Sequence, residues 1–414
     1  MKKLLALAVV ASSVVFTAGS ALAATPTWVT ANSTATGDQD NASIATNRNG
    51  YVAVVWEDDR DSTDATDNAH SEIYLRLFHN GTAAYEVKLS AAGSSGVTNW
   101  RHLHPDVGLD DKGNAVVVWQ DDPDGNGYYN IPYRVVNTAG TVTASGNANT
   151  SSDGQQINPR VAVDPDGAPS TAAVSFTVVW EDIQTGTPAT VKAAGFTGPT
   201  TRGYEVTASQ TTGQHHNPDV AVSASGDAVV VWDEDGDANG AYNVGLIRLA
   251  RTNGAATLSR RTANALGSGQ ELHASVAANF NGDFAVAWES DHTGTAGAWT
   301  RSFDATGTPR FTDVEVAAGG KAPSIGIDDQ SNTVVGWTVQ ATDLDVWVRG
   351  FGTTGTDAGH LSAQRLSQAT VGRQEQQVVA VSPYAQVVTA YTDDNDGNTY
   401  DQVILGQDIT NNTW

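Results

Sequence analysis

The stretch "AVVVWQDDPDG", residues 115–125, joins a β-branched apolar run to an acidic turn. Its first half has the composition of a buried strand, and it ends on a large aromatic residue, Trp119. The same ending recurs along the chain, and we call its last residue the anchor. The other anchors are Trp56, Trp180, Trp232, Trp288, Trp337 and Tyr391. They recur about every 50 to 60 residues, which is the scale of one blade of a β-propeller.

Each anchor strand is the second of four strand signals. A short apolar strand precedes it across a turn such as "DDKGN" at 110–114, which is typical of a β-hairpin. Two more alternating runs follow, as in "NVGLIRL" at 243–249 and "ATLSRRT" at 256–262. We call the four strands A, B, C and D. The sequence therefore predicts an all-β chain that forms a seven-bladed β-propeller with four antiparallel strands per blade.

Two features indicate a closed ring of blades. The residue after the strand A Val or Ile is small in every repeat, which permits close approach at a central axis. These residues are Ala45, Gly108, Ala162, Ala221, Ala277, Gly326 and Ala380. After Tyr391 only one more strand follows, near 401–407, whereas residues 28–30 resemble a strand D without its own blade. We expect this N-terminal strand to complete the last blade and to remove the open sheet edges.

The first residues have the pattern of a secretory signal peptide. Lys2 and Lys3 precede an apolar run that ends in the small-residue motif at 21–23. We therefore expect residues 1–23 to be removed, residues 24–414 to form one domain, and the protein to be secreted. The chain has no cysteine, so disulfides are excluded, and no later segment is long and apolar enough to span a membrane. We expect a monomer.

The charge limits the class of partner. The formal net charge is −24, which disfavours nucleic acid and anionic membranes and favours a basic protein surface.

The repeat resembles that of secreted bacterial β-propellers built on P-x-V-A-V-x-x-x-G-x-x-V-V-V-W. The streptomycete dispase autolysis-inducing proteins, which act on an extracellular protease, are of this class. The resemblance covers nearly the whole mature chain. It implies a propeller fold, and it favours binding to an extracellular protein.

The acidic loops between strands B and C lie on the same face as the D–A loops in this strand order. Three of them place oxygen-bearing side chains at alternate positions around a glycine, a pattern typical of calcium ligands. The candidate ligands are Asp122, Asp124, Asn126, Asp233, Asp235, Asp237, Asn239, Asp394, Asp396 and Asn398. None of the loops has the glutamate that completes an EF-hand, and such loops are also ordinary turns. Calcium is thus a candidate cofactor, and a calcium-stabilised cell-surface module is one alternative function.

A second set of residues on this face lies three positions before the strand A Val or Ile, and we call it the ring. Its members are Asn41, His104, Asn158, Asn217, His273, Ala322 and Gln376. His102, His215 and His216 lie nearby. Imidazoles and amides around a channel mouth can bind a peptide, a sugar or a transition metal. A structural role is the alternative, in which the ring side chains bond to the neighbouring blade's backbone.

Two further expectations concern single side chains. The acidic residues after three anchors, Glu57, Glu181 and Glu289, are expected to pair with strand C arginines of the same sheet. If it is exposed, the glutamine-rich segment "GRQEQQ" at 372–377 can act as a transglutaminase substrate.

The catalytic motifs that a sequence can reveal are absent. There is no H-E-x-x-H, no G-x-S-x-G and no cysteine nucleophile. The ring has no carboxylate, which argues against a glycosidase centred on the channel, although two placed carboxylates suffice for one. The preferred hypothesis is a secreted, non-catalytic propeller that binds another macromolecule, a protein such as a secreted protease. The alternative is a carbohydrate-binding or carbohydrate-cleaving propeller.

Overall fold

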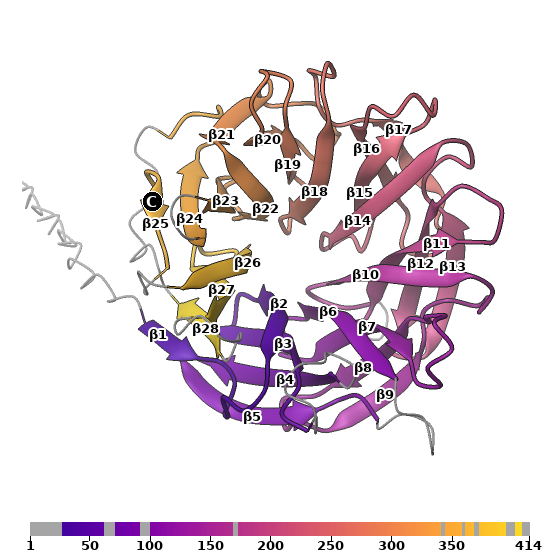
Figure 1. The fold of residues 1–414 in the computed structure, drawn as a ribbon, viewed down its shortest axis with the longest axis vertical. Coiled ribbons are helices and arrows are strands. Elements are labelled where there is room, and N and C mark those ends of the chain that lie inside the picture. Colours follow the sequence, from indigo (N-terminus) through magenta and orange to yellow (C-terminus); the bar gives the residue numbers. More distant parts are fainter. Residues whose placement is uncertain are drawn as a thin grey trace, which may run out of the picture.

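The computed structural model describes residues 27–61, 71–91, 100–168, 173–340, 344–357, 361–367, 372–394 and 402–407. Every regular element in these ranges is a β-strand, and the strands form seven four-stranded sheets around one axis (Figure 1). All pairings within the sheets are antiparallel, and the chain order of the strands is also their order in six of the sheets. The predicted seven-bladed propeller is confirmed.

The blades are numbered from the first complete sheet. Blade 1 consists of β2 (Gln39–Thr46), β3 (Tyr51–Asp58), β4 (Glu72–His79) and β5 (Thr82–Lys88). Blade 2 consists of β6 (Arg101–Leu109), β7 (Ala115–Asp122), β8 (Pro132–Val136) and β9 (Val142–Asn147). Blade 3 consists of β10 (Gln155–Val163), β11 (Phe176–Ile183), β12 (Thr190–Gly198) and β13 (Thr201–Thr207). Blade 4 consists of β14 (Gln214–Val222), β15 (Ala228–Asp235), β16 (Asn243–Leu249) and β17 (Ala256–Thr262).

The remaining blades follow the same plan. Blade 5 consists of β18 (Glu271–Ala278), β19 (Phe284–Ser290), β20 (Gly297–Phe303) and β21 (Val314–Ala318). Blade 6 consists of β22 (Gly320–Ile327), β23 (Thr333–Gln340), β24 (Leu344–Phe351) and the short β25 (Gln364–Arg365). Blade 7 consists of β26 (Arg373–Val381), β27 (Val387–Asp394), β28 (Gln402–Gln407) and β1 (Thr27–Thr30).

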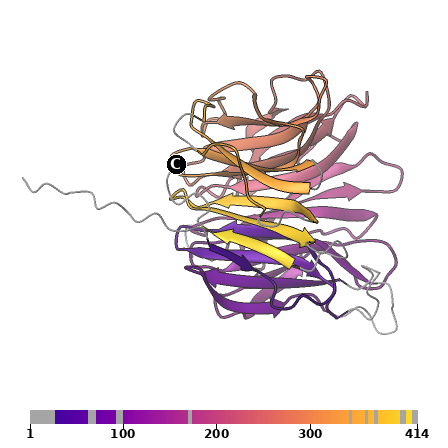
Figure 2. The ribbon, with the colours of Figure 1, turned by 60° about the vertical axis from the view of Figure 1, so that its left-hand side comes forward.

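The two ends of the described chain meet in blade 7. Strand β1 pairs with β28, with Trp28 opposite Gly406 and Thr30 opposite Ile404. The Ala31 N–H extends the pairing by donating to the Val403 carbonyl at 2.7 Å. In Figure 2 the indigo start of the chain lies beside the yellow C-terminal strands. Closure by the N-terminal strand is as predicted. Through it, the edges of β1 and β28 that face each other are paired by hydrogen bonds.

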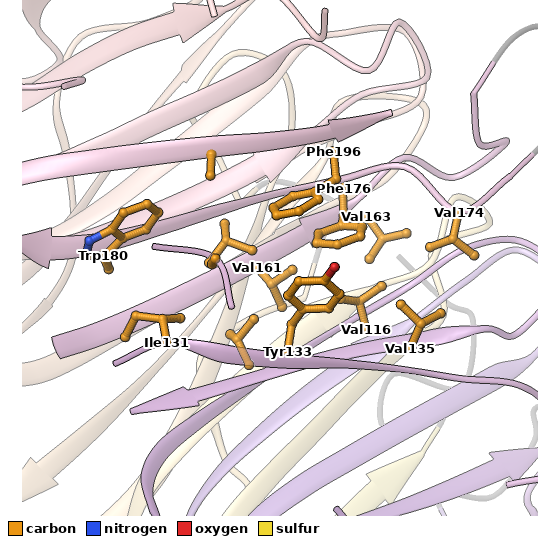
Figure 3. Packing of buried hydrophobic residues seen from close by; sticks show 14 residues of the cluster. Val116, Ile131, Tyr133, Val135, Val161, Val163, Val174, Phe176, Trp180 and Phe196 are labelled. Atoms are coloured by element: carbon orange, nitrogen blue, oxygen red, sulfur yellow. The ribbon is translucent and has the colours of Figure 1, made fainter. Parts of the chain in front are cut away.

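The hydrophobic core lies between blades. In Figure 3, Val116 and Tyr133 of blade 2 pack against Phe176 and Phe196 of blade 3. The two phenylalanine rings stack with centroids 4.5 Å apart, and the Tyr133 ring meets both of them edge-on. All seven anchors are at most 2% exposed, so each buries a large apolar side chain.

The small residues of strand A allow neighbouring blades to approach each other closely, as the sequence predicts. A Cβ added to Gly108 would lie 2.7 Å from the Val163 Cγ2 atom of the next blade. At Gly326 the corresponding distance to the Val381 Cγ2 atom is 2.5 Å. Both distances are too short for a carbon–carbon contact, so the innermost strands converge where these residues lie.

Removing the closure contact tests the ring. Trp28 packs edge-on against Tyr391, with centroids 6.3 Å apart, and its ring covers Gly406. We expect Trp28→Ala to lower the free energy of unfolding by about 2–4 kcal/mol, because a large, half-buried aromatic is lost from the pairing that closes the ring. Denaturant unfolding followed by tryptophan fluorescence measures this. An unchanged midpoint would show that β1 does not stabilise the ring.

Candidate functional site

The innermost strands of all seven blades enclose a polar well along the axis. Its cavity volume is about 580 Å³, and strand A residues of every blade line it. The ring lies at the end of the well that faces the B–C loops, and we call this end the mouth. At the opposite end the Arg48 guanidinium of blade 1 lies over the Phe280 ring of blade 5, with Cζ 4.2 Å from the centroid. Because these two blades are not neighbours, this contact spans the axis at that end, and we call it the floor.

The ring residues share one unusual backbone conformation. All seven have positive φ, between 45° and 55°, and each lies where the register of strands A and B shifts by a β-bulge. Asn and His tolerate this left-handed conformation better than most residues, which explains their use in five of the blades. The sequence predicted the ring but gave no sign of the bulge.

The bulge turns a backbone N–H out of its own sheet and towards the preceding blade. The His104 N–H donates to the Glu57 Oε1 atom at 2.6 Å, and the Asn217 N–H donates to the Glu181 Oε1 atom at 2.7 Å. Ala322 donates in the same way to Glu289 at 2.6 Å. For the Asn158 N–H of blade 3, the acceptor is an amide of blade 2, Gln120, instead of a carboxylate. The acceptor is in each case the residue after a tryptophan anchor.

The ring side chains continue this network around the mouth. His104 Nδ1 lies 2.9 Å from Asn158 Oδ1, and the Asn158 amide donates to Glu181 at 2.8 Å. Asn217 donates to Asp233 Oδ2 at 2.7 Å. Two further contacts continue the network through blades 5 and 7: His273 with Glu289 at 2.9 Å, and Gln376 with the Asn41 N–H of blade 1 at 2.8 Å. We call the ring and its acceptors the belt.

Burial and hydrogen bonding set the charges of the belt. Burial raises the pKa of Glu57 well above its usual value, with a further contribution from Asp40, and burial raises the pKa of Asp233 to about 6. Burial also acts to raise the pKa of Glu181, but hydrogen bonds from His216, Asn217 and Asn158 outweigh it and lower the value. The hydrogen bond to Glu181 raises the pKa of His216.

A charged level lies inside the well, two residues below the ring. Asp106, Arg160 and Asp219 occupy this level in blades 2, 3 and 4, and all three line the well. The other blades place Ser43, Ser275, Ser324 and Val378 there. Sequence reasoning missed this level, although the charged residues stand out in a column of serines. It therefore also missed that the well contains carboxylates.

The predicted binding residues fall into two groups. His104, Asn158, Asn217, His273 and Gln376 line the mouth.

The second group consists of the three other histidines predicted to bind, His102, His215 and His216, and none of them lines the well. His102 is 2% exposed and bonds to Asp121, and His215 is buried against Glu234. His216 contacts Glu181 from beside the mouth, with Nδ1 3.0 Å from Oε2.

The candidate calcium loops form self-contained turns. The Asp122 carboxylate accepts the N–H groups of Asn126 and Gly127, and Asp235 accepts those of Asn239 and Gly240. The remaining loop ligands, Asp124 and Asp237, accept the side-chain amides of Asn126 and Asn239.

The other candidate ligands are placed differently. Asp233 belongs to the belt, and Asp396 and Asn398 lie outside the described residues, whereas Asp394 ends β27. Within the described ranges, no group of three or more acidic or histidine side chains is arranged to hold a metal. Calcium binding stays a prediction.

Two expectations about single side chains were wrong. Glu57, Glu181 and Glu289 bond to the next blade's backbone and not to strand C arginines. Most of those arginines instead reach a neighbouring blade: Arg76 donates to the Ala31 carbonyl of the preceding blade, and Arg248 donates to the Ala305 carbonyl of the following one. The reason is that successive side chains of a strand alternate between the two neighbouring blades.

The glutamine-rich segment is also not an exposed loop. It forms the start of β26, in which Gln374 is 0% exposed and Gln377 is 4% exposed. Gln374 donates to Asp393, and Gln377 donates to the Ala322 carbonyl of blade 6. Gln377 thus joins blades 6 and 7, whereas Gln374 bonds within blade 7, and neither buried side chain is accessible to a transglutaminase.

No protein-family model matches the chain, and no curated protein matches it. Among solved structures, one of a protein of unknown function from Dyadobacter fermentans is 11% identical, with a TM-score of 0.51 and coverage of 92% of this chain and 96% of that chain. An α-L-arabinofuranosidase from Fusarium graminearum, solved with an iminosugar inhibitor, is 9% identical, with a TM-score of 0.51 and coverage of 75% and 94%. An α-L-arabinanase from Penicillium chrysogenum, solved with arabinobiose, is 9% identical, with a TM-score of 0.50 and the same coverage.

At these identities the likeness shows the fold alone. None of the described residues forms a helix that could cross a membrane.

The left-handed ring position gives a matched pair of variants. Ala322 is exposed, has φ of 45° and lacks the side chain that the other blades use. We expect Ala322→Asn to raise the free energy of unfolding by about 0.5–1 kcal/mol, because asparagine tolerates left-handed φ better. Asn158→Ala should lower it by about 1–3 kcal/mol, because it also removes the partner of His104 Nδ1 and one of the hydrogen bonds to Glu181. Chemical denaturation measures both, and equal effects of the two variants would contradict this account.

Raised carboxyl pKa values predict a pH dependence of stability. Burial raises the pKa of Asp219 and of Asp233 to about 6, and that of Asp40 to about 7. A carboxyl with a higher pKa in the folded state binds more protons there, so stability falls as pH rises from about 4 through these values. The hydrogen bonds to Glu181 and Glu289 raise the pKa of His216 and of His273, and this acts in the same direction.

We therefore expect the melting temperature to be a few degrees higher at pH 5.5 than at pH 8, measured by calorimetry at constant ionic strength. Asp233→Asn should reduce this difference, whereas Asp304→Asn, at an exposed turn, serves as the control. A melting temperature that rises with pH over this range would contradict the assignment.

Proposed function

We propose that the chain is a secreted, non-catalytic propeller that binds an extracellular protein, such as a secreted protease, at the mouth of its well. The belt is the observation that carries this proposal. Its carboxylates accept hydrogen bonds from backbone N–H groups of the next blade, so their oxygens hold the scaffold. A general acid or base needs an oxygen that is free to meet the substrate. The belt is therefore suited to present a rigid, preorganised surface.

Charge and exposure around the mouth support a protein partner. His104 is exposed, and the His273 side chain is 51% exposed, so both imidazoles are accessible. Acidic B–C loops surround them on the same face, and the net charge of −24 favours a partner with a basic patch. Such complementarity speeds association and makes binding sensitive to salt.

A capture experiment with matched variants tests the proposal. The mature chain is immobilised and exposed to spent culture medium, and captured proteins are identified by mass spectrometry. We expect a defined partner whose capture falls about tenfold in His104→Asn/His273→Asn, a loss of about 1.4 kcal/mol, and also falls at high salt. Asparagine keeps the left-handed backbone, so the fold is retained.

The control is Tyr384→Ala, because Tyr384 is 71% exposed on the opposite face, in the A–B turn of blade 7. A partner lost in the Tyr384 variant and retained in the histidine variant would place binding on the other face. A glycan array under the same conditions covers the alternative partner. Strong binding there, with no protein captured, would overturn the proposal.

A further inference from the structure

The charged level of the well holds a single cation among uncharged and acidic neighbours. Arg160 points from blade 3 into the cavity, and it is flanked by Asp106 of blade 2 and Asp219 of blade 4. The other side chains at this level are hydroxyls and one valine. A guanidinium offers five N–H donors in a planar fork that matches a carboxylate.

Most of these donors are unused. Among the described residues, the one hydrogen bond that Arg160 donates goes from NH1 to the adjacent Pro159 carbonyl, at 2.9 Å. No acidic oxygen of those residues lies within ion-pair distance of it, whereas Arg251 below the well lies 3.0 Å from an Asp164 oxygen. Arg160 is therefore an available donor group inside a cavity.

The flanking aspartates are held by other partners. The two Asp106 oxygens accept the Ser43 hydroxyl at 2.5 Å and the Val161 N–H at 2.7 Å. The Asp219 oxygens accept the N–H groups of Val220 and Val276, both at 2.8 Å. The bonds to Ser43, Val161 and Val276 join neighbouring blades, so the aspartates stay in place and leave the guanidinium fork open.

We propose that Arg160 is the receptor for a polypeptide carboxylate that enters the well from the mouth. This deepens the proposed function and rests on it, because the same mouth admits the partner. The floor formed by Arg48 and Phe280 obstructs the far end of the well, so a chain end that enters from the mouth fits it better than a continuous segment. The C-terminal carboxylate of the partner is then the group that reaches Arg160, with the Ser275 hydroxyl at the same level as a further donor.

The site also predicts a pH dependence of binding. The titratable groups that face Arg160 are Asp106 and Asp219 on the flanking strands and His104 above it. A bound carboxylate would raise the pKa of each, so binding takes up protons. Affinity for a carboxylate should therefore increase as pH falls from 8 to 6.

The experiment uses a peptide as a probe. The mature chain is titrated calorimetrically with N-acetyl-Gly-Gly-Ala carrying a free C-terminal carboxylate, and with the same peptide as its C-terminal amide. We expect the acid to bind at least tenfold more tightly than the amide, and more tightly at pH 6 than at pH 8. Arg160→Gln should remove this preference, and Arg160→Lys should retain part of it.

Arg134→Gln is the matched control, because Arg134 also donates from NH1 to the carbonyl of the preceding residue and lies outside the well. Equal binding of acid and amide, or a preference that survives Arg160→Gln, would overturn the proposal. Binding of glucuronate without binding of the peptide acid would overturn the assignment to a polypeptide end. If the peptide fails while capture still depends on His104 and His273, the proposed function stands and this inference alone is lost.

Discussion

The centre of the molecule depends on one hydrogen bond, repeated between successive blades. A residue with positive φ on strand A donates its N–H to the side chain that follows the anchor of the preceding blade, as His104 does to Glu57 and Ala322 to Glu289. The bulge is required because a regular strand directs its N–H groups to strands of its own sheet. A hydrogen bond to a charged acceptor contributes about 1.5–3 kcal/mol. At Glu181 and Glu289 such bonds outweigh burial and lower the pKa, whereas at Glu57 burial prevails and raises it.

This bond also determines what the well presents. It fixes the ring side chains at the mouth, and it sets which residues lie below them, because the register changes at each bulge. The aspartates at the charged level repeat the same device one step deeper by accepting N–H groups of the next blade. Arg160 is the exception, since it lies in this level without joining two blades. The ring and the aspartates below it are therefore built on one repeated contact, and we expect function where a blade departs from it.

The sequence predicted the fold well and the site only in part. Anchor periodicity predicted the blades, the small residues of strand A predicted the close approach at Gly108 and Gly326, and the pattern at residues 28–30 predicted the closure. Contacts between blades were not predictable, because strand alternation does not tell which neighbouring sheet a side chain will meet. Glu57 was therefore assigned to its own sheet, and Asp106 and Arg160 were overlooked because the bulge shifts the inward-facing positions.

Native-state amide hydrogen exchange measures the central contact directly. If the N–H groups of His104 and Asn217 are bound by buried side chains of the preceding blade, they should exchange as slowly as those of a core strand such as β7. Exchange of these two amides at the rate of an exposed turn would show that the blades are not joined in this way, and the belt would then not exist in solution.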